Sequence, residues 1–297
     1  MVYQNNHACS TIGGKGNSWV FSAANGFDLT RSQHQDLGKN SPSVKIQTTT
    51  VPITIDPSRS ALVIIDMQNY FLSRALGRNA ESGRHLIDKL LQDAIPAARK
   101  AQMPVIWLNW GLDEDDLASM PPAVTRTFGF AGPGDAAKHS DHSQTVNVTL
   151  LDKFGKPKSD LSHKYAGLGS EYQGIICDPE TGEQMHDPGL CLMKGAWNGA
   201  LYPPLDNAYL EGSKLETRPD VLLHKSRMSG LCGATSEFER FLHAEGITTL
   251  FFAGVDTDRE CRCYCGWCCP SCTDDACQIA SEELFRMAIT KIMTASC

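Results

Sequence analysis

Four short apolar segments predict the strands of one buried sheet. They run from Ala61 to Asp66, from Val105 to Asn109, from Asp220 to Leu223 and from Ile247 to Gly254. Short runs of this kind are typical of parallel strands that are covered on both faces. The first run ends in the carboxylate of Asp66, which places this side chain at the carboxyl edge of the predicted sheet.

Helical patterns lie between these strands. After the first strand, apolar residues recur at helical spacing, namely Leu86, Ile87, Leu90, Leu91 and Ile95. Pro96 is expected to kink this run or to begin a second helix, because proline lacks the backbone N–H that a helix interior uses. Before the fourth strand, Ser236 and Glu239 have the spacing of a capping box, and Gly246 is expected to end the helix. The alternation predicts an open parallel sheet with helices on both faces, in which ligands bind at the carboxyl ends of the strands.

Two other regions are less regular. Residues 1–58 are polar, and we interpret them as an N-terminal arm that wraps the domain and ends in a short strand, Val51 to Ile55. Residues 59–297 then form a single α/β domain. Within it, residues 111–219 are rich in Gly and Pro. Long irregular stretches in compact domains are usually functional, so we expect this one to build substrate walls and contacts between subunits.

Composition narrows the class of protein. The chain has 297 residues, of which 41% are hydrophobic and 21% charged, as in an ordinary folded protein. A formal net charge of −7 argues against nucleic acid or an anionic membrane as a partner. No window reaches the ~18 apolar residues of a membrane span, and the first residues lack the pattern of a secretory signal. We therefore expect a cytoplasmic protein with no membrane and no nucleic-acid partner.

Three reactive groups are predicted to meet at the carboxyl edge: the carboxylate of Asp66, the ammonium of Lys225 and the thiol of Cys261. A nearby cation lowers the pKa of a thiol, and a carboxylate can accept the thiol proton and return it to a leaving group. Each residue alone has an ordinary explanation, as a helix cap, a solvated lysine or a small core residue. Their joint placement favours nucleophilic catalysis.

Four segments carry a resemblance to a known family. Leu62–Phe71, Ala97–Trp107, Lys225–Gly230 and Gly246–Asp258, in this order, resemble the isochorismatase-like cysteine hydrolases. The Asp-Met-Gln-Asn and Gly-Val-x-Thr-Asp stretches within them are the specific parts. The middle segment, around Gly195–Pro204, is similar to long fungal members.

The resemblance implies a Rossmann-like three-layer α/β/α sandwich with a mainly parallel sheet. It also implies an Asp-Lys-Cys triad, in which Asp66 matches the acid and Lys225 the lysine. Gln68, Phe71 and Trp197 are weaker candidates for the pocket wall, because packing roles explain them equally well.

The C-terminal segment departs from that family. The family's nucleophilic cysteine stands two residues after the Thr-Asp pair, where this chain has Glu260, so Cys261 is one place late. Seven of the 12 cysteines lie between Cys261 and Cys277. Residues 260–274 also lack the helix and strand that the family has there, which leaves the last strands of the sheet open.

Three explanations of residues 260–274 are compatible with the sequence. The first is an error of reading frame or splicing. The second is a zinc knuckle formed by Cys265, Cys268, Cys269 and Cys272, whose two pairs are closer together than those of ordinary zinc sites. The third is a set of reduced, unliganded cysteines, with Cys261 still the nucleophile after a one-residue shift.

These patterns predict a hydrolase that acts on a small amide, ureide or isochorismate-like substrate through a thiolate. The alternatives are a non-catalytic member that binds or interacts, because its nucleophile position is disrupted, or a zinc-stabilised C-terminal knuckle. We expect a small-molecule substrate, no cofactor and no metal in the hydrolase site. The resemblance also implies subunit contacts, so a homo-oligomer is compatible with it.

Overall fold

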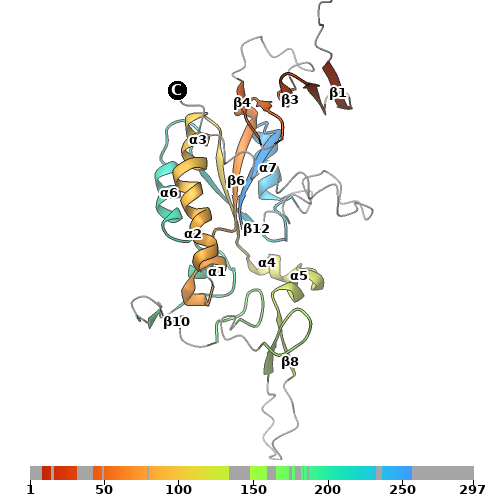
Figure 1. Cartoon of the computed structure of the whole chain (residues 1–297). Helices are drawn as coiled ribbons and strands as arrows, with labels where there is room; N and C mark the ends of the chain where they lie inside the picture. The colour runs from red at the N-terminus through yellow and green to blue at the C-terminus, as the bar shows by residue number, and fades with distance from the viewer. Residues whose placement is uncertain are drawn as a thin grey trace, which may run out of the picture.

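The fold is that of a computed structural model, shown in Figure 1. The structure describes residues 9–14, 17–31, 43–48, 50–78, 80–133, 148–158, 165–173, 176–177, 182, 184–185, 187–231 and 236–255. Among these residues, no helix is long and apolar enough to cross a membrane.

The centre of the fold is a four-stranded parallel sheet with the strand order β12-β7-β6-β13. Its strands are β6 (Ser60–Ile65), β7 (Val105–Trp110), β12 (Val221–Lys225) and β13 (Thr249–Gly254). All four strands were predicted from the sequence, with bounds that differ by at most two residues. β6 comes first along the chain among these four strands, yet it lies between the second, β7, and the fourth, β13. The direction of winding therefore reverses between β6 and β13. Such a reversal is the switch point at which doubly wound sheets bind ligands.

Helices cover both faces of this sheet, which confirms the predicted Rossmann-like α/β/α sandwich (Figure 1). One face carries α2 (Ala80–Lys89), α3 (Ile95–Lys100) and α6 (Leu205–Gly212), and the other carries α7 (Glu237–Ala244). Alternate strand residues enter two separate cores: Ile64 and Trp107 belong to the first, Val63 and Leu108 to the second. This alternation follows from the period of two along a strand.

The predicted helix boundaries also hold. A π-helical turn, Leu90–Ala94, joins α2 to α3, and Pro96 lies in the first turn of α3. The wider turn is a local adjustment of the kind that accommodates proline, which supplies no N–H and crowds the preceding turn. At α7, the Ser236 hydroxyl accepts a hydrogen bond from the Glu239 N–H at 3.0 Å, and Gly246 follows the helix with a φ of 65°.

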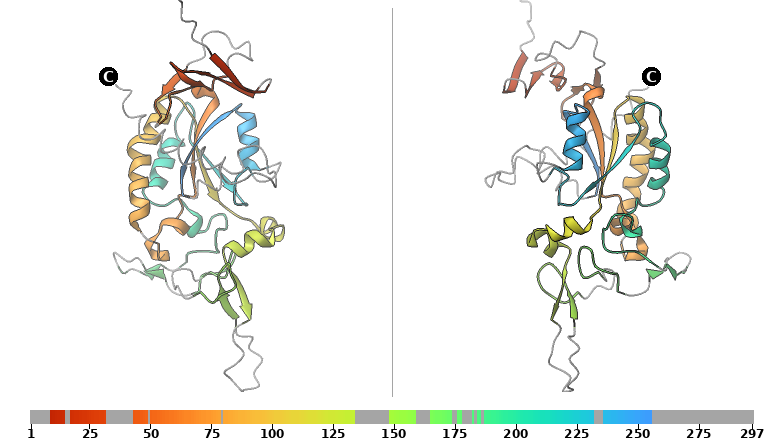
Figure 2. Two further views of the ribbon diagram at one scale, coloured as in Figure 1. Left: turned by 45° about the vertical axis from the view of Figure 1, so that its right-hand side comes forward. Right: turned by 180° about the vertical axis from the view of Figure 1, so that it is seen from behind.

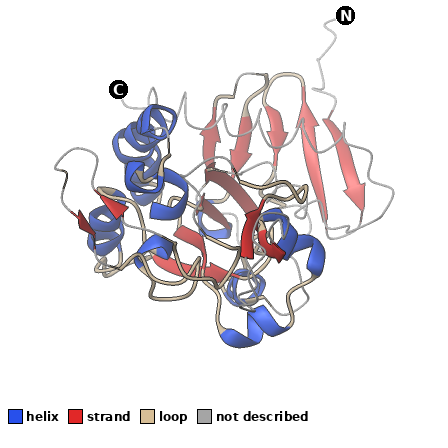
Figure 3. Ribbon diagram, turned by 90° about the horizontal axis from the view of Figure 1, so that it is seen from below, coloured by secondary structure: helices blue, strands red, loops and turns tan. Residues whose placement is uncertain are grey.

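The N-terminal segment forms a second sheet of five strands in the order β1-β2-β3-β5-β4. These are β1 (Cys9–Gly14), β2 (Asn17–Ser22), β3 (Gly26–Asp28), β4 (Val44–Ile46) and β5 (Ile53–Ile55). We expected only the last of them. All six residues of β1 are exposed, so it has no buried face that an alternating pattern could reveal. Figure 3 shows this sheet to one side of the helices, and Figure 1 shows it beyond the amino ends of the central strands.

Apart from α6, which covers a face of the sheet, the described elements of the middle segment, residues 111–219, lie beyond the opposite, carboxyl ends of the central strands (Figures 1 and 2). Its short elements are α4 (Glu114–Ala118), α5 (Pro122–Thr127), β8 (Phe130–Pro133), β9 (Val148–Leu151), β10 (Ile176–Cys177) and β11 (Gln184–Met185). Helix α1 (Asn69–Leu72) and short 3₁₀ turns at Pro57–Arg59, Arg74–Leu76 and Trp197–Gly199 complete the described elements. Because the middle segment folds over the carboxyl edge, it closes that edge with an aromatic cluster that includes Tyr70, Trp110 and Tyr165.

Candidate functional site

Asp66 stands immediately after β6, at the switch point of the sheet. Asp66 is fully buried. Its backbone φ is 55°, in the left-handed region that aspartate tolerates better than most residues do. The Asp66 N–H donates to the Leu108 carbonyl at 3.0 Å, and the Asp66 carbonyl accepts from the Gln68 N–H at 2.8 Å. This tight turn ends the strand and fixes the carboxylate at its carboxyl edge.

Lys225 is the last residue of β12, and its ammonium reaches Asp66. The Lys225 Nζ lies 3.0 Å from Oδ2 of Asp66, and both side chains are only 1% exposed. The same Nζ donates to the Met228 carbonyl at 3.2 Å. A buried pair of this kind is held by mutual attraction and by additional hydrogen bonds, since each charge alone would be costly to bury. The structure therefore brings together two of the three residues that the sequence placed at this edge.

The carboxyl end of β13 lies beside that of β6, at the same edge of the sheet. Gly254 pairs with Ile65 in the parallel ladder, and the Val255 N–H donates to the Ile65 carbonyl at 3.1 Å. Cys261, the third residue of the expected triad, lies outside the described residues, as does the whole cysteine-rich segment. In the sequence, it follows Val255, the last described residue, by six positions.

The weaker candidates for the pocket wall, Gln68, Phe71 and Trp197, make contacts with other groups of the protein. Gln68 is fully buried, and its side-chain amide donates to the Trp110 and Gly199 carbonyls at 2.8 and 2.7 Å. Phe71 and Trp197 are half-buried and pack against the aromatic cluster. Their pocket roles stay predictions, and the contacts of Gln68 add a structural role.

Two further residues at this edge, Trp110 and Asn109, were not among the site residues predicted from the sequence. The Trp110 ring centroid lies 5.2 Å from Lys225 Nζ, a cation–π contact. Asn109 is buried, and its Oδ1 has no hydrogen-bond partner within the described part of the chain. Both residues end β7, so a rule that inspects the last two positions of every buried strand would have found them.

A cavity of about 390 Å³ opens beside Lys225 at the carboxyl edge. Its wall carries side chains of both charges, among them Asp113, Lys194, Arg227 and Glu237. The Lys194 ammonium lies 3.0 Å from Asp113, and this hydrogen bond is the main reason why the Lys194 pKa is raised. Burial lowers the pKa of His224, also in the wall, so the imidazole is neutral near pH 7. The cavity suits a small polar molecule.

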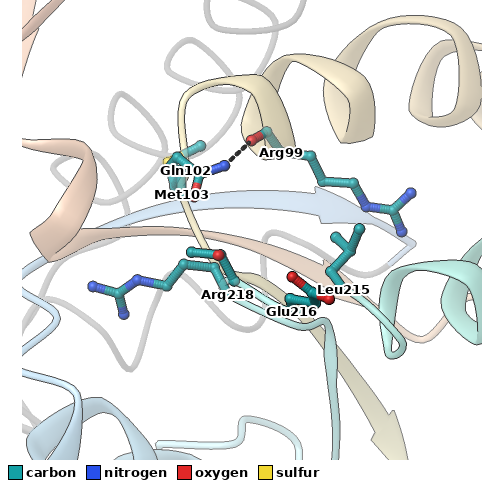
Figure 4. Close-up of a pocket in the computed structure, with 7 residues that line it drawn as sticks. Arg99, Gln102, Met103, Leu215, Glu216 and Arg218 are labelled. Carbon is teal, nitrogen blue, oxygen red and sulfur yellow. Dashed lines mark hydrogen bonds between the residues drawn. The ribbon is translucent and has the colours of Figure 1, made fainter.

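A second cavity, of about 340 Å³, lies at the opposite edge of the sheet (Figure 4). Arg99 in its wall binds the buried Asp220 carboxylate at 2.6 and 3.2 Å, and Arg218 lies 3.2 Å from Glu245. Figure 4 shows their guanidinium groups pointing away from each other. These arginines already hold protein carboxylates, and ligands of such sheets bind at the carboxyl edge. The candidate site is therefore the first cavity and the ion pair beside it.

The three described cysteines do not supply a nucleophile at this site. Cys9 and Cys177 are exposed on the N-terminal and middle segments, and Cys191 is buried in the aromatic cluster. Burial raises the pKa of the Cys191 thiol to about 12. A thiol with so high a pKa is a poor nucleophile near neutral pH.

Fold and site together define a Rossmann-like α/β protein with a buried acid–lysine pair at the ligand-binding edge of its sheet. Residues 60–158 match the family model of the isochorismatase domain. The chain is 26% identical over 257 residues to the ureidoacrylate amidohydrolase RutB of Methylobacterium radiotolerans, covering 82% of this chain and 76% of the relative. It is 24% identical over 236 residues to the enzyme of the same name from Rhizobium rhizogenes, covering 77% and 72%. These similarities agree with the resemblance to the isochorismatase-like cysteine hydrolases that the sequence motifs carry.

Two solved structures are also similar, each at 16% identity. A cysteine hydrolase from Pseudomonas syringae pv. phaseolicola has a TM-score of 0.35, covering 68% of this chain and 61% of its own. The yeast nicotinamidase Pnc1p, bound to the inhibitor nicotinaldehyde, has a TM-score of 0.32, covering 66% and 74%. TM-scores of this size say nothing further about the site.

Proposed function

We propose that this protein hydrolyses a C–N amide bond of a small molecule through a thiolate nucleophile. The observation that carries the proposal is the buried ion pair between Asp66 and Lys225 at the switch point, 3.0 Å apart. The match of residues 60–158 to the isochorismatase domain supports a hydrolase, and the amidohydrolase names of similar proteins support an amide or ureide substrate. We assign Cys261, which follows β13 in the sequence, as the nucleophile.

In the proposed acylation, the Asp66 carboxylate takes the proton of the Cys261 thiol, and the thiolate attacks the carbonyl carbon. The C–N bond of the resulting tetrahedral adduct then breaks, and Asp66 returns its proton to the leaving nitrogen. An acyl thioester and an amine or ammonia are the products of this half-reaction. Lys225 orients the carboxylate and offsets the negative charge that passes between acid and thiol.

In deacylation, Asp66 takes a proton from water as the water attacks the thioester carbonyl. Breakdown of the second adduct expels the thiolate, which regains the proton from Asp66. The free acid leaves and the starting state is restored, so the cycle consumes one amide and one water and needs no cofactor. The roles of acid and base fall on the same carboxylate, which must therefore be ionised at the start of each half-reaction.

The rival proposal is a non-catalytic protein that binds a small molecule in the same cavity. The observation in its favour is Glu260, which occupies the position where the family has its cysteine. A one-residue shift moves a side chain by more than the ~1 Å that already costs on the order of a hundredfold in rate. The two proposals differ in a single measurable property, turnover.

The test is turnover of a panel of small amides and ureides, with ureidoacrylate and nicotinamide included because similar proteins carry those names. Released ammonia is measured for the wild-type chain and for Asp66→Asn, Lys225→Met and Cys261→Ser. We expect each variant to lose at least about 10²- to 10⁴-fold in kcat/KM, the usual contribution of one acid–base group. Cys263→Ser is the matched control and should retain turnover. Full turnover in Asp66→Asn or Lys225→Met would overturn the mechanism, and no turnover by the wild-type chain on any compound favours the binding protein.

A further inference from the structure

The strand order places Asp66 and Lys225 on strands that are not neighbours. β7 lies between β6 and β12. Adjacent strands are about 4.8 Å apart, so the ends of β6 and β12 are separated by roughly 10 Å. The Lys225 side chain must therefore cross the end of β7 to reach the carboxylate. The residue of β7 that pairs with Lys225 in the ladder is Trp110.

The indole of Trp110 lies where the lysine crosses. Lys225 Nζ is 5.2 Å from its ring centroid, and the Trp110 residue is only 2% exposed. The ring of Phe128 packs edge-on against the indole, with the centroids 5.0 Å apart and the planes at 77°. The aromatic face is thus fixed in a dry environment, in which a cation–π contact is stronger than at an exposed surface.

The backbone of Trp110 is held by Gln68, which follows Asp66 by two residues. Oε1 of Gln68 accepts from the Trp110 N–H at 2.9 Å, and Nε2 of Gln68 donates to the Trp110 carbonyl at 2.8 Å. Gln68 is joined to Asp66 by a backbone hydrogen bond of 2.8 Å. One side chain therefore ties the turn that holds the acid to the residue that faces the lysine.

We propose that Trp110 is a positioning residue, whose indole face holds the Lys225 ammonium at Asp66. The proposal rests on the proposed function for its catalytic meaning, since positioning matters to the rate only if the ion pair works in turnover. Lysine has a flexible stem with several rotamers, and an ion pair alone fixes the distance but not the path of that stem. The indole supplies the second point of contact, and the Met228 carbonyl supplies a third, at 3.2 Å.

The contact predicts a graded response to the identity of residue 110. Tryptophan binds a cation better than tyrosine or phenylalanine, and leucine has no π face at all. The order of Lys225 stabilisation should therefore be Trp, then Tyr or Phe, then Leu. A residue that only fills space would instead rank these variants by fit, with no special relation to the charge of Lys225.

A double-mutant cycle on the full chain tests the proposal without reference to turnover. The equilibrium constant for unfolding is measured by urea denaturation for wild type, Trp110→Leu, Lys225→Met and the double variant. A second cycle uses Trp110→Phe in place of Trp110→Leu. We expect a coupling of roughly 2- to 30-fold between Trp110→Leu and Lys225→Met, and a smaller coupling for Trp110→Phe. The matched control pairs Trp110→Leu with Lys45→Met, an exposed lysine of β4, for which we expect no coupling.

Turnover, where present, supplies a second readout. Trp110→Leu should lower kcat more than it changes KM, and Trp110→Phe should rescue part of the loss. Coupling to Lys225 no larger than to Lys45, or equal effects of Phe and Leu, overturns the proposal for Trp110. Failure of the proposed function is recognised separately, because it is full turnover of Lys225→Met in the otherwise unchanged chain.

Discussion

The ion pair at the carboxyl edge shows how one side chain can join strands that do not touch. Lys225 bridges from β12 to the acid after β6, and both side chains are withdrawn from water. Removing one member would leave an uncompensated buried charge, which typically costs about 3–5 kcal/mol. The pair was predictable as a juxtaposition, because each residue follows a strongly apolar strand. The contact with Trp110 was not, because it depends on the ladder register of two strands far apart in sequence.

At the same scale, the buried thiol of Cys191 should be inert. Its pKa is raised to about 12 by burial, so near pH 7.5 it stays protonated, and iodoacetamide reacts with thiolates. We expect peptide mass analysis of the folded protein to show alkylation of Cys9 and Cys177 but not of Cys191. Alkylation of Cys191 should appear only after unfolding in urea. Labelling of Cys191 in the folded protein at the rate of Cys177 would contradict the structure.

The same experiment bears on the proposed nucleophile. An activated Cys261 should react faster than Cys263 and Cys265, its neighbours in the cysteine-rich segment. The neighbours serve as internal controls, because all three thiols are read from one digest. Equal rates for the three would remove the support for a thiolate at position 261.

At the scale of elements, the strands and helices that have a regularly spaced buried face could be predicted from the sequence, and those without one could not. The central strands and α7 have one or two buried faces, and their apolar spacing located them within two residues. Helix α6 in the middle segment and strands β1 to β4 were not predicted from the sequence. Strand β1 is exposed at every position, and its Ser, Thr and Gly residues carry no period. Hydrogen bonds to the neighbouring strand define it, and these leave no mark in a hydropathy pattern.

The junction of β13 with β6 should depend on Gly254. Its φ is 114°, and a Cβ there would lie 2.1 Å from the Ile65 carbonyl oxygen, which is backbone and cannot move aside cheaply. We expect Gly254→Ala to lower the free energy of unfolding by about 2–5 kcal/mol, because backbone strain and overpacking add. Urea denaturation provides the measurement.

Gly246→Ala is the matched control for that variant. Gly246 has a φ of 65° but no atom within 4 Å of a built Cβ, so only the left-handed conformation is penalised. The cost should be about 1–2 kcal/mol. Equal losses for the two variants would mean that the close approach of β13 to Ile65 does not occur.

At the scale of the whole molecule, the two ends of the central sheet are covered by different parts of the chain, and the candidate site lies at only one of them. The N-terminal sheet closes the amino end, and the middle segment and the ion pair occupy the carboxyl end (Figure 1). Parallel strands force this division, because all their carboxyl ends meet at one edge. That geometry let the sequence locate two candidate site residues. The cavity wall combines the end of β12, the turn after it and the start of α7 with a few residues of the irregular middle segment, and no hydropathy pattern predicts that combination. The proposed nucleophile, Cys261, belongs to a segment whose composition predicts no regular element.

The N-terminal sheet should unfold together with the rest of the molecule. Leu29, Ile46, Ile53 and Ile55 belong to the same apolar core as Ile64 and Trp107 of the central sheet. Arg31 also donates to the Thr248 carbonyl, at 3.1 Å. Contacts of this kind make two sheets one cooperative unit. We therefore expect urea unfolding to give one transition, with the same midpoint for the fluorescence of Trp19 in β2 and for far-UV circular dichroism.

Ile53→Ala sharpens this last prediction, because Ile53 lies in β5 and is only 4% exposed. Truncation of a buried isoleucine to alanine costs about 2–5 kcal/mol. In one cooperative unit, that loss shifts the Trp19 signal and the circular dichroism equally. The Trp19 signal is isolated as the difference between otherwise identical chains with and without Trp19→Phe. If residues 1–58 were an arm that folds by itself, Ile53→Ala would shift the Trp19 signal alone, and the central sheet would unfold at its original midpoint.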